Sequence, residues 1–375
     1  MLGSPLPSPG VNSLELPLIE KRNNEHVIHY DILGLTYWMF ARIEEIERTD
    51  LDRHGRFAAN LSNAYLHNYL ERPVVDEWLD ILRQVILQQW PEIKIKNHRF
   101  EIELSHDVDR PFRYLYVSRA NIVRQVFGDF VKRRNISVGF KRYITWNAVR
   151  SGELRLDPFN TFDWIMDQLE RFSISSTFNF ICGRTENVLD ADYDLENLEI
   201  RKLLKNIHSR GHKIGLHPSY NAYQKQDTVN QEFKLLKRIC MSEEIEQEEW
   251  GGRMHYLRWK QPLTMCILND AGLNYDASLG YADHAGFRCG TCHEYTMFDA
   301  VNGEIMSLKQ RPLVVMDSSI FDHNYMNLEL GQEAVEYCRQ LALNCRKVGG
   351  KFTLLWHNSS LETCIQRNIF EAMLN

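Results

Sequence analysis

The sequence predicts an α/β protein, a distorted (β/α) barrel of about seven strands preceded by a smaller N-terminal α/β or helical domain. From residue 99 onward, apolar runs of strand length alternate with amphipathic helical segments, a pattern typical of βα units in a parallel sheet or barrel. Several helical segments are followed by glycine, which commonly ends a helix. The chain has 375 residues, enough for a barrel and an extension at about 150 residues per domain.

The domain organisation follows from changes in composition along the chain. Residues 1–25 are rich in proline, serine and glycine at their start and predict a flexible N-terminal arm. Residues 26–98 predict a small accessory domain, with helical spacing of apolar residues at 37–46 and 75–87. Residues 99–375 predict the barrel. No internal repeat is evident, so solenoids and propellers are not indicated.

The elements of the barrel can be assigned in order. The expected strands are residues 100–104, 177–181, 213–216, 256–259, 274–277, 313–316 and 352–356. The expected helices at 195–210, 263–271 and 333–348 are followed by Gly211, Gly272 and Gly349. Each glycine is the stop signal expected in a loop from a helix to the next strand.

The composition excludes several classes of protein. Hydrophobic residues make up 44% and charged residues 25%, as in ordinary globular proteins, so collagen-like or wholly disordered structure is not expected. The formal net charge is −6 and no basic block stands out, which argues against nucleic-acid binding. No apolar run approaches the roughly 18 residues of a membrane-spanning helix.

Cysteine usage and the N-terminus bear on localisation. The eight cysteines lie mostly in apolar or helical contexts, which fits reduced thiols rather than a disulfide framework. The first residues have neither the cationic start nor the apolar run of a secretory signal. A cytoplasmic location is therefore expected.

Acidic and imidazole side chains follow three of the expected strands. Asp107 and Asp109 follow the first strand, His217 the third and His357 the last. Loops at the C-terminal ends of barrel strands share one face, so these side chains should converge. Two aspartates two residues apart point to the same side of an extended segment, which suits a metal site where one binds and the other polarises water. The alternative is an aspartate-rich turn that caps the next helix, with each histidine structural.

Five motifs in a fixed order favour the metal site over the helix-capping turn. They are LSHDVDRP, GHKIGLHPSYN, YLRWKQPLT, GLNYDASLG and LLWHN. Together they resemble the polysaccharide deacetylase superfamily, also called the NodB-homology fold or carbohydrate esterase family four. The resemblance covers the chain from about residue 100 to its end. The segments GYADHAGFRCGTC and HGRF further resemble a bacterial subgroup tied to surface-polysaccharide gene clusters.

The resemblance implies a metal-dependent hydrolase that removes an N-acetyl group from an amino sugar of a surface polysaccharide or its precursor. Such an enzyme is an amidohydrolase acting on linear amides, with a divalent metal, zinc being the expected ion, and an acetamido sugar or glycan as substrate. The implied catalytic residues are Asp107 as base, Arg258 to orient it, Asp276, and His357 as general acid. The implied metal ligands are Asp109, His217 and Asn221.

Asn221 departs from the family pattern because it stands where a second ligand histidine is expected. An amide oxygen is a weaker, neutral ligand for zinc than imidazole. This leaves open a weak site, another metal, or a non-catalytic sugar-binding or scaffold protein that keeps the deacetylase fold.

Several other residues have a functional and a structural interpretation. Tyr220, Trp259 and Trp356 could stack on sugar faces, or they could be core or rim residues, as tyrosine and tryptophan usually are. In RCGTCH, Cys289, Cys292 and His293 have the spacing of c-type haem attachment. With His284 they could instead hold structural zinc, or they could form an ordinary loop with reduced cysteines.

Overall fold

The computed structural model describes residues 19–374, so the first 18 residues of the expected arm lie outside the described residues. The N-terminal part consists of an antiparallel hairpin and three helices, β1 (Ile19–Arg22), β2 (Glu25–Ile28), α1 (Ile32–Phe40), α2 (Asn63–Leu66) and α3 (Val74–Gln89). Asp31 caps α1 by accepting a hydrogen bond from the Gly34 amide. Asp76 and Glu77 lie in the first turn of α3, where acidic side chains favour the helix dipole.

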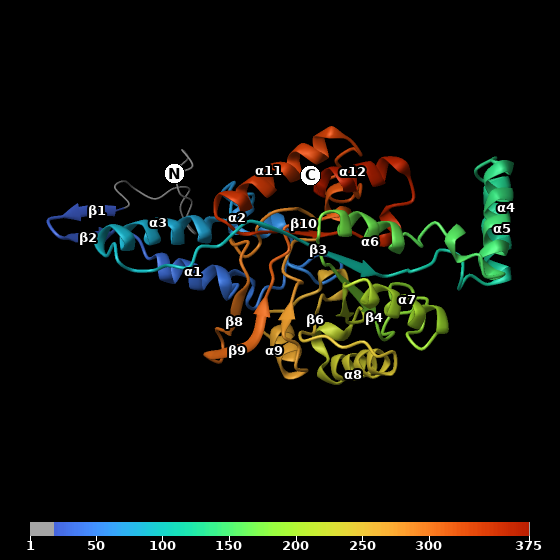
Figure 1. The fold of residues 1–375 in the computed structure, drawn as a ribbon, viewed down its shortest axis with the longest axis horizontal. Helices are drawn as coiled ribbons and strands as arrows, with labels where there is room; N and C mark the ends of the chain where they lie inside the picture. The colour runs from blue at the N-terminus through green and yellow to red at the C-terminus, as the bar shows by residue number, and fades with distance from the viewer. Residues whose placement is uncertain (1–18, 375) are drawn as a thin grey trace.

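A nine-stranded sheet forms the centre of the molecule and confirms the expected α/β class (Figure 1). Its spatial order is β10-β11-β3-β4-β5-β6-β7-β9-β8, and every neighbouring pair is parallel except β9 with β8. The strands are β3 (Glu101–Val108), β4 (Thr177–Ile181), β5 (Lys213–His217), β6 (Gly251–Gly252), β7 (Tyr275–Asp276), β8 (Tyr295–Asp299), β9 (Glu304–Gln310), β10 (Val315–Met316) and β11 (Lys351–Leu355).

Backbone hydrogen bonds partly close this sheet into a distorted barrel. The Leu313 amide donates to the Leu279 carbonyl, and the Gly286 amide donates to the Val314 carbonyl. These bonds join the segment after β7 to the segment before β10, the strand at one edge of the sheet. The carboxyl ends of the parallel strands therefore face one mouth.

Six of the seven expected strands overlap strands of the structure, and the one at 256–259 is wrong. The first two of those residues lie in a 3₁₀ turn, His255–Leu257, where Tyr256 has a φ of 61°. The true strand is β6, made of Gly251 and Gly252. A Cβ atom on Gly252 would lie 2.0 Å from the Leu216 carbonyl oxygen, so close approach of the backbones replaces the apolar pattern of a strand.

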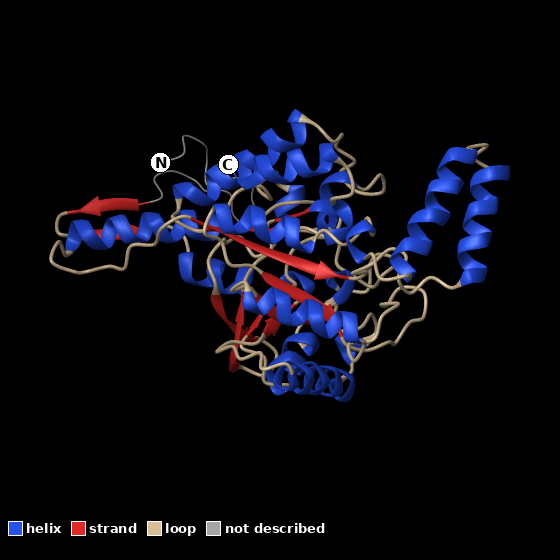
Figure 2. Ribbon diagram, turned by 45° about the vertical axis from the view of Figure 1, so that its right-hand side comes forward, coloured by secondary structure: helices blue, strands red, loops and turns tan. Residues whose placement is uncertain are grey.

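The helices cover the sheet and end where the glycines indicate. They are α6 (Phe162–Arg171), α7 (Leu198–Ser209), α8 (Gln226–Ser242), α9 (Leu263–Asp270), α10 (Asp317–Phe321), α11 (Gln332–Lys347) and α12 (Cys364–Leu374). Gly211, Gly272 and Gly349 adopt φ of +81°, +83° and +64°, the left-handed conformation that terminates a helix. Two further helices, α4 (Arg119–Val131) and α5 (Ile136–Arg150), form an antiparallel hairpin that projects from the body (Figure 2).

The N-terminal part has its own small core, centred on Trp78 of α3, and packs on the barrel through a buried ion-pair network. Arg288 Nη2 lies 2.6 Å from Glu45 Oε2, and Arg42 Nε lies 2.8 Å from Glu45 Oε1. Arg42 Nη2 also donates to the Tyr281 hydroxyl of the barrel at 3.3 Å. Because buried charges must be paired, this network fixes how the two parts meet. No described helix is both long enough and apolar enough to cross a membrane.

Candidate metal and catalytic site

A cavity of about 310 Å³ opens at the carboxyl ends of the parallel strands. Its lining comes from the ends of β3, β5, β10 and β11 and from the segment after β6. It is lined by Arg56, Asp107, Asp109, His217, His255, Tyr256, Leu257, Met316, Ser318, Asp322, Tyr325, His357, Ser359 and Ser360. Four residues expected to converge, Asp107, Asp109, His217 and His357, thus share one cavity.

Asp109, His217 and His255 form a cluster with the geometry of a metal site. Their candidate ligand atoms all lie within 4.8 Å of one another. Asp109 Oδ1 lies 3.3 Å from His217 Nε2 and 3.5 Å from His255 Nε2. Asp109 Oδ1 and His255 Nε2 are buried and have no hydrogen-bond partner among the described residues. Buried polar atoms without partners are costly, so a cation between them fits this site.

Both histidines of the cluster are held in the orientation of metal ligands. The Nδ1 atom of His217 lies 2.5 Å from the Arg253 carbonyl oxygen, and that of His255 lies 3.1 Å from Asp190 Oδ1. An N–H donated at Nδ1 leaves the Nε2 lone pair free to face Asp109. Two imidazole nitrogens and one carboxylate oxygen make a three-ligand set, as in catalytic zinc sites that keep a position open.

Asp107 lies beside this cluster but is bound by other groups. Its Oδ1 accepts hydrogen bonds from Arg253 Nη1 at 2.9 Å and Asn179 Nδ2 at 2.7 Å. Its Oδ2 lies 3.8 Å from His217 Nε2. Burial raises the pKa of Asp107, but Arg253, the two neighbouring histidines His217 and His357, and the Asn179 hydrogen bond together keep the pKa below its ordinary value. The carboxylate is therefore ionised, with one oxygen available at the site.

His357 lies near the second carboxylate oxygen of Asp109 and is oriented by Asp317. His357 Nδ1 lies 2.7 Å from Asp317 Oδ1, and the His357 amide donates to Asp317 Oδ2 at 3.1 Å. The other ring nitrogen, Nε2, lies 3.8 Å from Asp109 Oδ2. Burial lowers the pKa of His357, but Asp317 more than compensates and raises it to about 10. A protonated imidazole thus faces the cavity.

The structure does not place Asn221 and Arg258 at the cluster, contrary to the sequence expectation. Asn221 Oδ1 accepts from Arg258 Nη1 at 2.9 Å, and Asn221 Nδ2 donates to the Thr185 carbonyl at 3.3 Å. Arg258 Nε donates to the His54 carbonyl at 2.7 Å. Arg258 thus binds the N-terminal part to the barrel, while Arg253 is the arginine that contacts Asp107.

Asp276 also lies apart from the cavity lining. It accepts hydrogen bonds from the amide and hydroxyl of Ser278, at 2.8 and 2.5 Å, and so stabilises the turn after β7. Burial raises its pKa to about 6. Its contacts with Ser278 are structural, whereas the sequence indicated a catalytic aspartate.

The three aromatic residues expected to bind sugar also lie outside the cavity lining. Trp259 and Trp356 are buried in the main core, where Trp356 packs edge-on against Phe370. Tyr220 is half-buried, and its ring lies 4.1 Å from the Arg258 guanidinium carbon. Tyr256 and Tyr325 are the aromatic residues of the cavity.

Sequence reasoning missed His255, Arg253 and Arg56, and the first two share one cause. Because the strand was expected at 256–259, Arg253 and His255 were placed before a strand instead of after one. Arg253 and His255 come directly after β6 and are two residues apart, which is the same spacing that indicated Asp107 and Asp109 as site residues. Arg56 enters from the N-terminal part and donates to the Tyr256 carbonyl at 2.9 Å and the Tyr325 hydroxyl at 3.0 Å.

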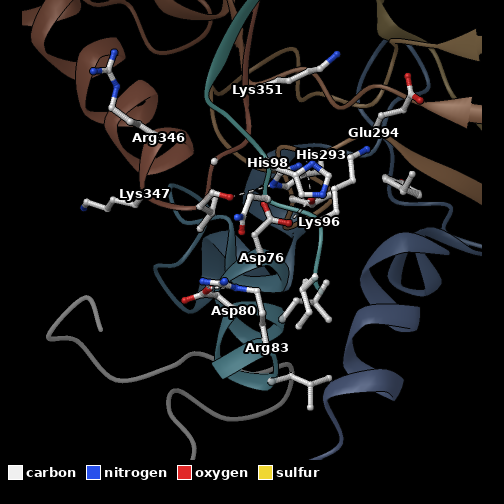
Figure 3. Close-up of a pocket in the computed structure, with 18 of the residues that line it drawn as sticks. Asp76, Asp80, Arg83, Lys96, His98, His293, Glu294, Arg346, Lys347 and Lys351 are labelled. Carbon is white, nitrogen blue, oxygen red and sulfur yellow. Dashed lines mark hydrogen bonds and ion pairs between the residues drawn. The ribbon is translucent and has the colours of Figure 1, made fainter. Parts of the chain in front are cut away.

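The RCGTCH segment lies at the other end of the barrel, beside a cavity of about 880 Å³ (Figure 3). Asp76 Oδ2 accepts from the Cys292 amide at 2.9 Å and its thiol at 3.3 Å, and His293 completes a group of three candidate ligands. His284 instead contacts the Ala285 carbonyl, at 2.7 Å. The set of Cys289, Cys292, His293 and His284 does not form a cluster within residues 19–374.

Comparisons with known proteins give the following similarities. A family model described as a family of unknown function, DUF7033, matches residues 8–91. No curated protein matches the chain. A solved structure from Mycobacterium smegmatis, described provisionally as a polysaccharide deacetylase, is 16% identical with a TM-score of 0.45, covering 75% of this chain and 85% of that one. The PuuE allantoinase structure is 12% identical with a TM-score of 0.42, covering 74% and 83%. Both TM-scores are below 0.5, and neither similarity identifies an activity for this chain.

Proposed function

We propose that this protein is a metal-dependent amidohydrolase that removes an N-acetyl group from an acetamido sugar of a surface polysaccharide or its precursor. The observation that carries the proposal is the arrangement around Asp109. Its buried Oδ1 and the Nε2 atoms of two histidines lie within 4.8 Å of one another. Asp107 Oδ2 lies 3.8 Å from His217 Nε2, and His357 Nε2 lies 3.8 Å from Asp109 Oδ2. A ligand set, a base and an acid in one cavity are what metal-assisted amide hydrolysis requires.

The residues that would hold the divalent metal are Asp109, His217 and His255. When bound, the ion would supply Lewis acidity toward the acetyl oxygen and lower the pKa of water at the site. Zinc is the ion that a carboxylate and two imidazoles fit best. Because His255 supplies a second imidazole, Asn221 gives no reason to regard the site as degenerate.

Asp107 acts as the general base in this proposal. Its carboxylate is ionised, and Arg253 and Asn179 hold one oxygen so that Oδ2 faces the cavity. Oδ2 takes the proton from the water whose oxygen bonds to the acetyl carbon. Because two hydrogen bonds hold the Asp107 carboxylate, it needs little reorganisation while the water oxygen bonds to the acetyl carbon.

His357 acts as the general acid. Asp317 accepts the Nδ1 proton, so Nε2–H faces the cavity and can donate to the nitrogen of the breaking C–N bond. The products are acetate and the free amine of the sugar. Arg56, Tyr256 and Tyr325 line the cavity and are positioned to contact the sugar. We also propose that residues 26–98 form an accessory domain whose role includes supplying Arg56.

An acetate-release assay tests the proposal. Protein stripped of metal with a chelator is reloaded with Zn²⁺, Co²⁺, Mn²⁺ or Mg²⁺ and incubated with N-acetylated amino sugars and glycans. Acetate and free amine should appear in equal amounts, with at least one metal, and should be lost on chelation. Glycan binding without acetate from any metal-loaded sample, with the fold intact by circular dichroism, would favour a non-catalytic sugar-binding protein.

A further inference from the structure

The α4–α5 hairpin carries exposed apolar side chains in a regular pattern. On α4 they are Val123, Phe127, Phe130 and Val131, and on α5 they are Ile136, Phe140, Tyr143 and Ile144. Both sets have the spacing i, i+4, i+7, i+8, which forms one stripe along a helix. The exposed fractions reach 65% for Phe127 and 73% for Ile136. Monomeric proteins rarely expose a contiguous apolar surface of this kind without a partner.

Phe130 packs against Gly139 of α5, but most of these side chains take no part in the buried contacts between the two helices. The hairpin has its own buried contacts, made by Ile122, Trp146 and Val149 with Tyr114 of the preceding loop. Each exposed stripe is displaced by one residue from this inner face, as Val123 follows Ile122 and Phe140 follows Gly139. Because the helices are antiparallel, the same displacement places both stripes on the same side of the hairpin. They therefore form one apolar face.

The hairpin is also strongly basic, although the chain as a whole is acidic. Residues 119–150 contain eight lysines and arginines and one aspartate, a net charge of +7, against −6 for the entire chain. Asp129 pairs with Arg133 and Arg142. The remaining cations of the tip and its flanks form no ion pair within the described part of the chain; they are Arg124, Lys132, Arg134 and Lys141.

We propose that the α4–α5 hairpin is a peripheral membrane-docking element that binds an anionic lipid surface. An apolar face flanked by unpaired lysine and arginine is what an interfacial helix needs, since apolar side chains enter the headgroup boundary and cations attract anionic lipid. Nucleic acid would use the charge but leave the phenylalanine and isoleucine side chains without a role. A second copy of the hairpin would cover the apolar face but bring two sets of positive charge together.

The position of the hairpin relates it to the proposed active site. Residues 109–118 connect the end of β3, which carries Asp107 and Asp109, to the start of α4, and Figure 1 shows β3 directed toward the hairpin. Docking would hold the mouth of the cavity near glycans attached to membrane lipid. This step rests on the proposed function, whereas membrane docking itself does not.

Vesicle co-sedimentation of the full-length protein tests the docking proposal without substrate or turnover. The vesicles are phosphatidylcholine alone or phosphatidylcholine with 30% phosphatidylglycerol, a composition chosen to supply about the negative charge of an anionic leaflet. Two variants are compared, Phe127→Ser/Ile136→Ser/Phe140→Ser and Lys132→Glu/Arg134→Glu/Lys141→Glu. Matched controls on other exposed surfaces are Val188→Ser/Met241→Ser/Val301→Ser and Lys205→Glu/Lys225→Glu/Lys234→Glu.

We expect the wild-type protein and both controls to bind the anionic vesicles and to bind the neutral ones far more weakly. Each charge reversal should lower the partition coefficient about fivefold or more, and the apolar variant should lower it at least tenfold. Circular dichroism of all variants verifies the fold. Binding of either hairpin variant at the level of its control overturns the proposal. The proposal is also overturned if the wild-type protein does not bind the anionic vesicles. That outcome includes a protein that binds DNA instead, or one that forms a dimer through the apolar face.

Discussion

His357 Nδ1 lies 2.7 Å from Asp317 Oδ1, and the two residues follow neighbouring parallel strands, β11 and β10. Parallel pairing brings together residues that are far apart in the sequence, and the His357 amide on Asp317 Oδ2 makes a second bond. The carboxylate thereby fixes both the orientation and the charge of the imidazole. This pair determines which nitrogen of His357 faces the cavity.

Asp317→Asn should move the alkaline limb of the pH profile of kcat/KM to lower pH. The amide oxygen can still accept from Nδ1, but the negative charge that raises the pKa of His357 to about 10 is lost. Because its pKa is raised to about 10, His357 stays protonated at neutral pH. The ion pair with Asp317 therefore stabilises the folded protein fully below about pH 6.5, and this stabilisation is lost as the pH rises through about 10. Acetate release measured from pH 6 to 10 checks the shift, and an unmoved limb would mean that His357 is not the acid.

Asp107→Asn should abolish most of the activity and leave metal content unchanged. Removing a general base typically costs about 10²- to 10⁴-fold in rate, and Asp107 lies outside the three-ligand cluster. Acetate release and metal content by plasma mass spectrometry are measured on the same sample. Asp227→Asn, at an exposed position of α8, is the control. Loss of metal from Asp107→Asn would make Asp107 a ligand instead of a base.

His255→Ala and Asn221→Ala should differ in metal binding. His255 Nε2 is a partnerless atom of the cluster, whereas the Asn221 amide is engaged by Arg258 and Thr185. We expect His255→Ala to weaken zinc binding at least tenfold, to the level of His217→Ala. Asn221→Ala should keep the wild-type stoichiometry. Competition with a chromogenic chelator gives the affinities, and the reverse ranking would restore Asn221 as a ligand.

Glu45→Gln should destabilise the protein by about 3 to 5 kcal/mol at neutral pH, because Arg42 and Arg288 would remain buried without their carboxylate. Burial raises the pKa of Glu45, but the two arginines lower it further, to about 2. The stabilisation from ionised Glu45 is thus present above about pH 4.5 and is lost as the pH falls through about 2.

Urea unfolding followed by tryptophan fluorescence at pH 7 and pH 3 measures this effect. Glu336→Gln, which removes an exposed i, i+3 ion pair with Arg339, is the matched control and should change stability by less than about 1 kcal/mol. A Glu45→Gln variant as stable as this control would show that the buried network does not hold the two parts together.

Much of the fold could be predicted because the spacing of apolar residues and the glycines that end helices are local properties of the sequence. The runs at 177–181 and 213–216 became β4 and β5 almost unchanged, and Gly211 and Gly272 ended their helices. β6 could not be found in this way, since its two glycines are selected by contact with Leu216 and Tyr275 from other strands. The β8–β9 hairpin was missed as well.

The candidate site was predictable to the extent that strand ends were correctly placed. Asp107, Asp109, His217 and His357 lie at or just after the carboxyl ends of strands that exist, and they share one cavity. Arg258 and Asn221 could not be separated from the site by pattern alone, because their mutual hydrogen bond depends on the tertiary fold. Arg56 could not be predicted as a cavity residue for the same reason, because its position depends on how residues 52–57 pack on the barrel.

The hydrogen bond from Arg258 to the His54 carbonyl joins residues 52–57 of the N-terminal part to the barrel beside the cavity. Gly55 lies against the same guanidinium, and Arg56 is delivered into the cavity directly after it. Removing residues 19–98 would therefore remove Arg56 from the cavity lining, together with the contacts between the N-terminal part and the barrel. Any laboratory expression of this protein should begin with both portions on one polypeptide.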